Sequence, residues 1–340
     1  MLLTKNEIAY LGEAFKDTTP ISLFANTTTV PDGSEYETLT KKGIIQGNSY
    51  APEALETLRL IAKPQRCTRL FYQNDFFIVE KYAYRSGEKL ILAENSNGDL
   101  LFKDGKELGG VVKSLENLLG RSSLQRSEIS TSLGREELMV LLALIDLYRK
   151  DTLEGYLSLT PSREAYSLGE IQDELESGFQ NGLVRLLKDR YAFPVPGSVA
   201  LKPLLSGLAK KGCIAVQDGY ALAEDYSILG RTFLIPDSFT FCESLQVLED
   251  GKLAMAGGLY VSAGVHDHLS FAIQEDEVEL SALSSAQMLA VFEEFLKCPE
   301  LAEGAPAPKA SQAPSTATWT CSCGTVNNGN FCVNCGSKRN

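Results

Sequence analysis

Four of the eight cysteines in this 340-residue chain lie within its last 22 residues. They form two close pairs, Cys321-x-Cys323 and Cys332-x-x-Cys335, and a glycine directly follows each pair. Four thiolates arranged in this way suit the tetrahedral coordination of Zn²⁺. The glycines let the backbone turn tightly and bring its N–H groups toward the sulfurs. The spacing therefore predicts one structural zinc ion, held by Cys321, Cys323, Cys332 and Cys335.

The segment around these cysteines is too short to fold by hydrophobic burial alone. Ordering each residue costs about 1–2 kcal/mol, whereas a structural zinc site supplies roughly 10–16 kcal/mol. A pair of disulfides or a redox-active tail is the alternative use of four cysteines. A catalytic zinc is disfavoured, because four cysteine ligands leave no open position for water.

The pattern W-x-C-x-C-G-x-x-N-x-G-x-F-C-x-x-C-G runs from Trp319 to Gly336. It resembles the short zinc ribbons that are appended to many bacterial proteins, and it is similar to the zinc finger of the Ran-binding-protein type. The sequence departs from the latter family, because a single residue separates its first two cysteines. The resemblance implies a zinc module over 319–340, with Trp319, Asn327 and Phe331 as candidate partner-binding residues. The alternative is that the aromatic rings only cap the ribbon.

The residues before the zinc module and the overall charge limit what the chain can bind. Residues 299–318 are dominated by Pro, Ala, Ser and Thr, which is typical of a semi-flexible linker. Asp and Glu total 44 against 32 Lys and Arg, so the formal net charge is −12. An acidic body repels a phosphate backbone, which disfavours nucleic-acid binding.

The N-terminal residues contain no uninterrupted apolar stretch of the kind found in signal peptides. The most apolar run, 138–147, is broken by Asp146 and is much shorter than the roughly 20 residues that span a bilayer. We therefore expect a cytoplasmic protein without a membrane span. Thiols stay reduced in that compartment, which favours metal ligation over disulfides.

The rest of the chain contains an internal repeat. Residues 39–45, LTKKGII, return as 208–214, LAKKGCI, and the pair Tyr50-Ala51 returns as Tyr220-Ala221. Similar patterns of helices and strands surround both copies. The repeat predicts an α+β fold of two tandem homologous units, which cover 1–125 and 131–298.

Each unit is expected to contain the same series of elements: a helix, a second helix that ends at Gly43 or Gly212, a short hairpin, a third helix, a β-meander and a closing helix. Capping boxes mark the starts of three helices, at Thr4-x-x-Glu7, Ser167-x-x-Glu170 and Ser284-x-x-Gln287. The alternating patterns predict strands over 68–73, 76–84 and 89–94, and over 238–242, 244–249, 258–263 and 269–274.

The second unit contains an additional helical pattern over 167–190. Its Ile171, Leu175, Phe179, Leu183 and Leu186 fall at helical spacing. Packing against the core of its own unit is favoured over a groove for a partner.

The body shows no common catalytic signature, so we expect no enzyme and no small-molecule substrate. The only two histidines, His266 and His268, are separated by one residue, and a polar hairpin turn is favoured over a metal pair. Cys67, Cys213, Cys242 and Cys298 stand singly and are expected to be buried thiols.

Two further resemblances concern the architecture of the body. A helix followed by KKG, a strand, a tight turn and another strand resembles the recognition helix and wing of many bacterial regulators, which implies tandem winged-helix units. The duplicated halves, the size and the acidic character resemble the EspG-type chaperones of type VII secretion, cytosolic proteins that hold secreted partner proteins.

These observations favour a non-enzymatic adaptor or chaperone-like protein that binds a protein partner, with a link to a bacterial secretion system and the zinc ribbon as a second contact. The alternative is a transcription-related regulator that binds nucleic acid through the winged-helix-like units or the ribbon.

Overall fold

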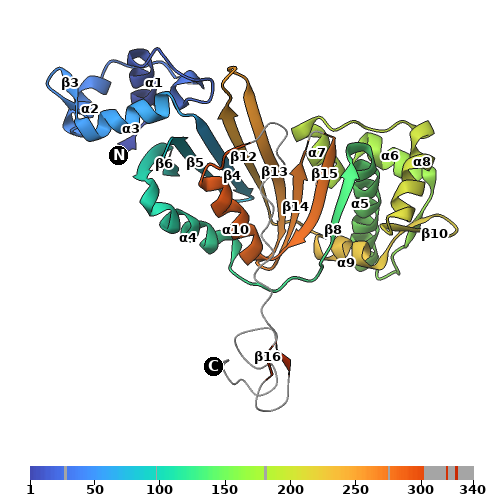
Figure 1. Cartoon of the computed structure of the whole chain (residues 1–340). Helices are drawn as coiled ribbons and strands as arrows, with labels where there is room; N and C mark the ends of the chain where they lie inside the picture. The colour runs from blue at the N-terminus through green and yellow to red at the C-terminus, as the bar shows by residue number, and fades with distance from the viewer. Residues whose placement is uncertain are drawn as a thin grey trace.

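The computed structural model describes residues 1–26, 29–96, 98–179, 182–274 and 276–301, together with the backbone of 319–320 and 326–327. The fold is α+β, as the sequence predicts. Its centre is an antiparallel ten-stranded sheet flanked by helices on both faces (Figure 1). Among the described helices, none combines the length and the apolar character that crossing a bilayer requires.

The strand order of this sheet is mirrored about its middle. The order is β1-β7-β6-β5-β4-β12-β13-β14-β15-β8, so a four-stranded meander and one outer strand lie on each side of the β4–β12 junction. The strands in this order are β1 Leu2–Leu3, β7 Asp99–Asp104, β6 Lys89–Ser96, β5 Ile78–Ser86, β4 Arg66–Asn74, β12 Ser238–Val247, β13 Leu253–Ala263, β14 Asp267–Ile273, β15 Glu277–Leu283 and β8 Ser130–Gly134.

The helices and small hairpins repeat in the same order on both sides, apart from η1 and η2 of the first half and β9, α6 and α7 of the second. In the first half they are α1 Lys5–Ala14, η1 Leu23–Asn26, α2 Glu35–Lys41, β2 Ile45–Gln46, β3 Ser49–Tyr50, α3 Pro52–Ala62, η2 Gly105–Glu107 and α4 Leu108–Leu119. In the second half they are α5 Arg135–Ser158, β9 Ala165–Tyr166, α6 Leu168–Ser177, α7 Leu183–Tyr191, α8 Ser198–Lys210, β10 Ile214–Val216, β11 Tyr220–Leu222, α9 Glu224–Thr232 and α10 Ser285–Leu296.

Local sequence explains where many of these helices begin and end. The three predicted capping boxes are present at Thr4, Ser167 and Ser284, where each side chain accepts a hydrogen bond from the third helical N–H. The glycines after α2 and α8, Gly43 and Gly212, both have a φ of +72°, the left-handed conformation in which glycine commonly ends a helix.

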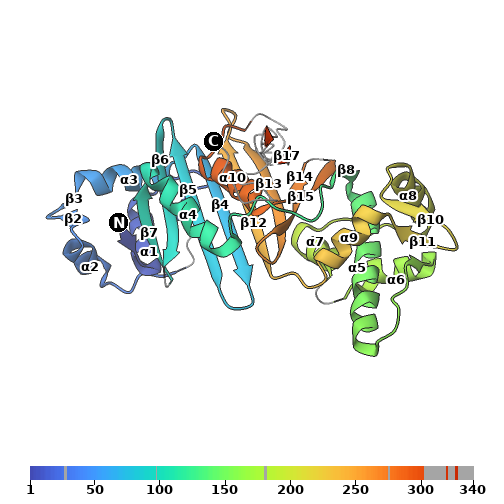
Figure 2. The same ribbon diagram turned by 90° about the horizontal axis from the view of Figure 1, so that it is seen from below.

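The two faces of the sheet pack against different helices. Leu70 and Tyr72 of β4 belong to the core beneath α4 and α10, whereas Cys67 and Phe71 belong to cores beneath the helices of the first and second halves. Since alternate side chains of a strand point to opposite faces, α4 and α10 cover one face, and the two helical groups cover the ends of the other. Figure 2 shows α4 and α10 next to each other along the sheet.

Several predicted strands need correction. The patterns over 238–242 and 244–249 form the single strand β12, which ends at Val247, because Glu243 lies within its alternation and pairs with Arg69 of β4. The sequence analysis missed β7 and β15, which complete the two meanders, and the outer strands β1 and β8. The domain boundaries at 125, 131 and 298 stay a prediction, and residues 302–318 of the proposed linker lie outside the described residues.

The additional segment of the second half forms two helices instead of one. Gly178, with a φ of +53°, ends α6, and α7 begins at Leu183. The prediction that this segment packs on its own half is confirmed, because Ile171, Leu175 and Leu183 are buried in the core around α5.

A buried ion pair of α5 anchors the start of α7. Asp146 Oδ1 lies 2.6 Å from Arg149 Nη1, and these side chains are 0% and 1% exposed. Asp146 Oδ2 accepts a hydrogen bond of 3.0 Å from the Val184 N–H in the first turn of α7. Burial raises the pKa of the Asp146 carboxyl, whereas the Arg149 guanidinium and the N–H groups at the start of α7 act in the opposite direction and favour its charged form.

Candidate functional site

All four residues predicted to hold zinc lie outside the part of the chain that the structure describes. Cys321, Cys323, Cys332, Cys335 and Phe331 are outside the described residues. Only the backbone of the other two candidates is described, and there Trp319 of β16 (Trp319–Thr320) pairs with Asn327 of β17 (Val326–Asn327). This antiparallel pair brings the two predicted binding residues opposite each other. The donor set of four thiolates fits Zn²⁺ by its chemistry.

No group of three or more potential metal ligands occurs in the part of the chain that the structure describes. The four single cysteines of the body, Cys67, Cys213, Cys242 and Cys298, are free and buried, as predicted. Burial raises the pKa of the Cys67 thiol to about 12 and that of Cys298 to about 11. These thiols stay protonated at neutral pH and are poor nucleophiles.

The two histidines occupy different environments, which corrects the expectation of a shared polar turn. His266 is exposed in the turn between β13 and β14, whereas His268 is in β14 and is 0% exposed. Its Nδ1 lies 2.8 Å from Ser262 Oγ and its Nε2 lies 3.0 Å from Ser285 Oγ. Since Ser285 donates its hydroxyl proton to the Val265 carbonyl, it accepts from His268 Nε2–H, and Nδ1 accepts from Ser262. A neutral imidazole therefore satisfies this network.

We expect stability to fall in mild acid because of His268. Burial, with a smaller effect of nearby His266, lowers the pKa of His268 from 6.5 to about 4. The unfolded chain thus binds a proton near pH 6.5 and the folded chain does not, so the free energy of unfolding should drop by about 3 kcal/mol between pH 6.5 and 4. Urea unfolding at several pH values measures this drop. This drop in the free energy of unfolding should disappear in His268→Gln and persist in the control His266→Gln. Equal pH dependence of the two variants would refute the prediction.

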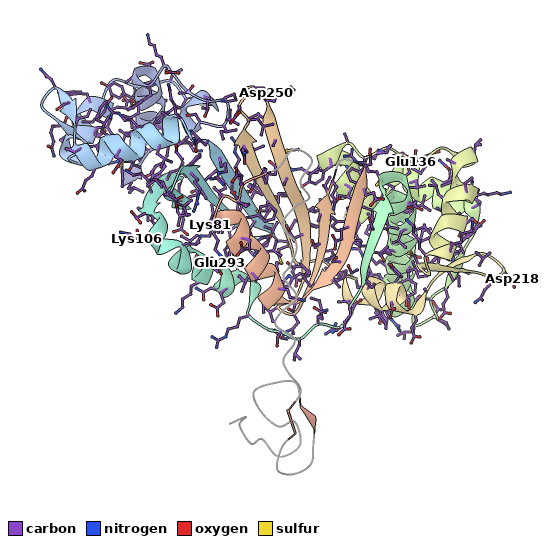
Figure 3. All side chains as sticks on the ribbon, viewed as in Figure 1. Lys81, Lys106, Glu136, Asp218, Asp250 and Glu293 are labelled. Atoms are coloured by element: carbon purple, nitrogen blue, oxygen red, sulfur yellow. The ribbon has the colours of Figure 1, made fainter. Side chains whose placement is uncertain are left out.

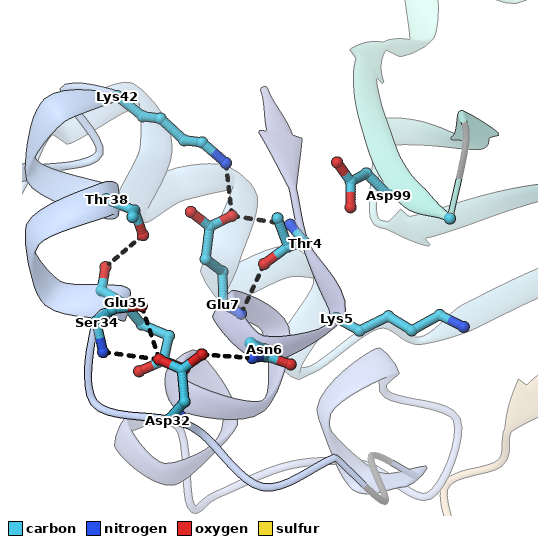
Figure 4. Close-up of a pocket in the computed structure, with 11 residues that line it drawn as sticks. Thr4, Lys5, Asn6, Glu7, Asp32, Ser34, Glu35, Thr38, Lys42 and Asp99 are labelled. Atoms are coloured by element: carbon cyan, nitrogen blue, oxygen red, sulfur yellow. Dashed lines mark hydrogen bonds and ion pairs between the residues drawn. The ribbon is translucent and has the colours of Figure 1, made fainter.

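A polar pocket of about 690 Å³ lies between the starts of α1 and α2 (Figure 4). Its buried carboxylates already have partners. Glu7 accepts from the Thr4 N–H at 2.8 Å and from Lys42 Nζ at 2.6 Å, and Glu35 accepts from the N–H groups of Asp32 and Gly33. Burial alone would raise the pKa of Glu7, but the hydrogen bonds from Lys42 and Thr4 outweigh it and lower the pKa. These hydrogen bonds hold the starts of the two helices in place. Because both carboxylates are used in this way, they are not available as catalytic groups or ligands.

A larger groove of about 1180 Å³ lies between α3 and the end of β7, and we call it the β7 groove. Its apolar lining consists of Met1, Leu2, Ile44, Ala51, Ala54, Leu60, Leu90, Ile91 and Phe102. Its charged lining consists of Lys42, Arg85, Lys89, Lys103 and Lys106 and of Glu53, Glu56, Glu88, Asp104 and Glu107. The groove therefore combines an apolar floor with a rim whose five positive and five negative side chains balance.

Many of the charges around the β7 groove are paired. Lys89 pairs with Glu56 across the groove, and Lys103 pairs with Glu94 behind it. The buried Nε of Arg85, by contrast, has no hydrogen-bond partner in the described structure. Small-molecule sites typically have volumes of about 300–1,000 Å³ and a few convergent polar groups. The β7 groove is larger than such sites, and it is apolar at its floor and balanced in charge. These properties fit a segment of polypeptide better than a small molecule.

The sequence analysis did not find this groove. Its residues come from the N-terminal residues, the end of α2, α3, β5, β6, β7 and η2, which are far apart in the sequence. No single one of these short segments carries a pattern that indicates a groove.

Comparisons with known proteins add little to this geometry. No protein-family model and no curated protein matches the chain. Among solved structures, the Mycobacterium tuberculosis type VII secretion system chaperone EspG5, in complex with a PE25-PPE41 dimer, is similar over 90% of this chain and 99% of its own, with 9% identity and a TM-score of 0.47. This chaperone belongs to the EspG type, which the sequence analysis named as a resemblance. The TM-score is too low to establish a common fold.

Proposed function

We propose that this protein is a non-enzymatic, chaperone-like adaptor that holds a protein partner in the β7 groove. The observation that carries this proposal is the groove itself, with its volume of about 1180 Å³, its apolar floor and its balanced charges. Apolar surface in a concave site gains free energy when a partner covers it, at about 25 cal/mol per Å². A rim of both signs favours neither a polyphosphate nor a strongly charged peptide.

The zinc ribbon is the second part of the proposal. One Zn²⁺ bound by Cys321, Cys323, Cys332 and Cys335 would order residues 319–340, and the module would provide a second contact for the partner. Two weak contacts on one chain strengthen binding because the second contact forms at a high effective concentration. A link to a bacterial secretion system is the finer part of the proposal, and only the architectural resemblance of the sequence supports it.

Site-specific crosslinking tests the proposed binding site. Lys106 lines the groove, and Asp218 in the turn between β10 and β11 lies at the opposite end of the molecule (Figure 3). A photoreactive benzoylphenylalanine at Lys106 should give a discrete adduct with one partner protein in cells, because a bound segment would contact the rim.

The same probe at Asp218, which is also exposed, is the matched control and should give no such adduct. Mass spectrometry of the purified adducts measures both outcomes. Adducts of equal yield at the two positions, or none at Lys106, would refute binding in the groove.

A further inference from the structure

The first half of the mirrored sheet contains a pair of arginines that the second half replaces with serines. Arg66 is the first residue of β4 and pairs with Arg85, the next-to-last residue of β5. In the same way, Ser238 is the first residue of β12 and pairs with Ser262, the next-to-last residue of β13. Both serines are buried, and Ser262 Oγ lies 2.8 Å from His268 Nδ1. The fold therefore accepts small neutral side chains at this position and does not require two cations there.

Both arginines lie on the face of the sheet that α4 and α10 cover. Thr68, two residues after Arg66 in β4, donates a hydrogen bond of 2.6 Å to the Phe295 carbonyl of α10, and residues two apart in a strand share a face. Arg85 is directly opposite Arg66 and shares this face. Burial raises the pKa of the Cys298 thiol just after α10, whereas the charges of Arg85 and Arg66 act in the opposite direction. The two guanidiniums are thus within electrostatic range of the end of α10.

The positive charges of this pair are not neutralised within the described part of the chain. Neither guanidinium forms an ion pair or a hydrogen bond there, and the buried Nε of Arg85 has no partner. Both side chains are half-buried, and like charges directly opposite each other in a sheet are destabilising. The C-terminus of α10 offers the equivalent of only about half a negative charge against two positive ones. An added anionic group would therefore stabilise the pair.

The surroundings of the pair indicate which anionic group fits. Guanidiniums bind carboxylates and phosphates through paired N–H donors. Arg85 also lines the β7 groove, whose five positive and five negative side chains balance, and Arg66 adds one positive charge beside that lining. A single carboxylate neutralises this excess, whereas a phosphate group carries about 1.5–2 negative charges and exceeds it.

We infer that Arg66 and Arg85 together bind one carboxylate of the partner protein, from an Asp or Glu side chain of the segment that lies in the β7 groove. The segment thus combines apolar residues for the floor of the groove with one acidic residue for this end. The identity of the ligand rests on the proposed function, to which the inference adds a recognition residue of stated charge and place.

The chain's own neighbouring carboxylate does not occupy the site. Glu300 follows Cys298 by two residues, and its side chain is exposed. Among the described residues it pairs with neither arginine. The next residue, Leu301, is buried, and its N–H donates a hydrogen bond of 2.7 Å to Gln246 Oε1. This contact fixes the chain just after Glu300 while the carboxylate stays in solvent.

Inorganic phosphate is a suitable probe of the two-arginine site, because one oxyanion can accept hydrogen bonds from both guanidiniums. The full chain is titrated with phosphate at neutral pH and constant ionic strength, and phosphorus NMR line broadening gives the dissociation constant. It should rise by about tenfold or more in Arg66→Gln and in Arg85→Gln. Neither variant should have a lower Tm, because each removes a repulsion between like charges.

Arg69→Gln is the matched control for these variants. Arg69 is in the same strand and is also half-buried, but it lies on the opposite face of the sheet. Phosphate binding should be unchanged in this variant. Equal phosphate binding by the unchanged chain and Arg66→Gln would overturn the two-arginine site. A Tm that falls in Arg66→Gln and not in Arg69→Gln would show that the arginine supports the fold, and it would also overturn the inference.

The crosslinking probe at Lys106 tests whether the partner supplies the carboxylate. The yield of its adduct should fall by about tenfold or more in Arg66→Gln and persist in Arg69→Gln, because loss of one cation leaves the partner's carboxylate poorly paired. An adduct that persists in Arg66→Gln would leave partner binding in place and overturn this inference alone.

Two other results would assign the site differently. Tighter phosphate binding in Glu300→Gln would show that the chain's own carboxylate competes for the arginines, and it would overturn the inference. Absence of any Lys106 adduct from the unchanged chain would overturn the proposed function, and with it the assignment of the carboxylate to the partner.

Discussion

The zinc content of the full chain should fall from one ion to none when Cys332 and Cys335 are both replaced by serine. Serine does not supply the thiolate ligands on which a four-cysteine site depends, and two remaining thiolates cannot complete a tetrahedral shell. The loss removes roughly 10–16 kcal/mol of binding free energy from a segment of 22 residues. Elemental analysis of protein purified without added metal measures the ion per chain.

A matched control for this experiment is Cys213→Ser. Cys213 is buried, and its Sγ donates a hydrogen bond of 3.3 Å to Tyr226. This variant should retain one zinc ion per chain because it does not touch the proposed ligands. Zinc at one equivalent in the double variant, or no zinc in the unchanged protein, would contradict the assignment of the four C-terminal cysteines.

Replacement of Asp146 by asparagine should destabilise the protein by about 3–5 kcal/mol. The substitution preserves shape but removes the carboxylate that faces the buried Arg149 guanidinium at 2.6 Å and accepts from the Val184 N–H at 3.0 Å. Both partners lie where water cannot replace the lost charge. Because native proteins are stable by only about 5–15 kcal/mol, the effect should be large in a urea unfolding curve.

The exposed pair on α7 is the control for the buried one. Arg185 and Asp189 form an i,i+4 ion pair whose side chains are 52% and 65% exposed. Asp189→Asn should therefore change the free energy of unfolding by less than about 1 kcal/mol. A similar, small effect of Asp146→Asn would show that the buried pair does not anchor the additional helices of the second half.

Local patterns predicted much of the secondary structure, because caps and turns act over a few residues. The capping boxes at Thr4, Ser167 and Ser284 and the C-terminal glycines of α2 and α8 are present as expected. The heptads at 39–45 and 208–214 correctly indicated that the same order of elements occurs twice. These signals need no knowledge of distant parts of the chain.

Where polar side chains interrupted the apolar pattern of a strand, the sequence analysis missed the strand or predicted two strands in its place. Glu243 interrupts an apolar pattern in β12, yet its backbone pairs with β4 and β13 like that of its neighbours. β15 alternates acidic and apolar residues in Glu277-Val278-Glu279-Leu280. That alternation is a strand signal in which Val278 and Leu280 turn inward and are buried. A sequence comparison between the two copies could have identified this strand.

The environments of His268 and Asp146 could not be inferred from their neighbours in sequence. His268 lies within β14 and is enclosed between Ser262 and Ser285 at the start of α10, whereas His266 lies in the exposed turn before this strand. Asp146 lies in an apolar run and meets the start of α7, 38 residues away. Contacts of this range depend on how helices pack after they form.

The sequence by itself determined the predicted zinc ligand set, the acidic charge, the α+β class and the duplicated order of elements, because each follows from residue types or from spacing within a short stretch. The tertiary structure decided that both halves share one sheet through nine pairs between β4 and β12. It also decided the β7 groove, whose lining combines residues of α3, β6 and β7. The pairs between β4 and β12 join residues that are 164 (Ser238 and Asn74) to 180 (Gln246 and Arg66) positions apart, and no local pattern specifies which strands will meet.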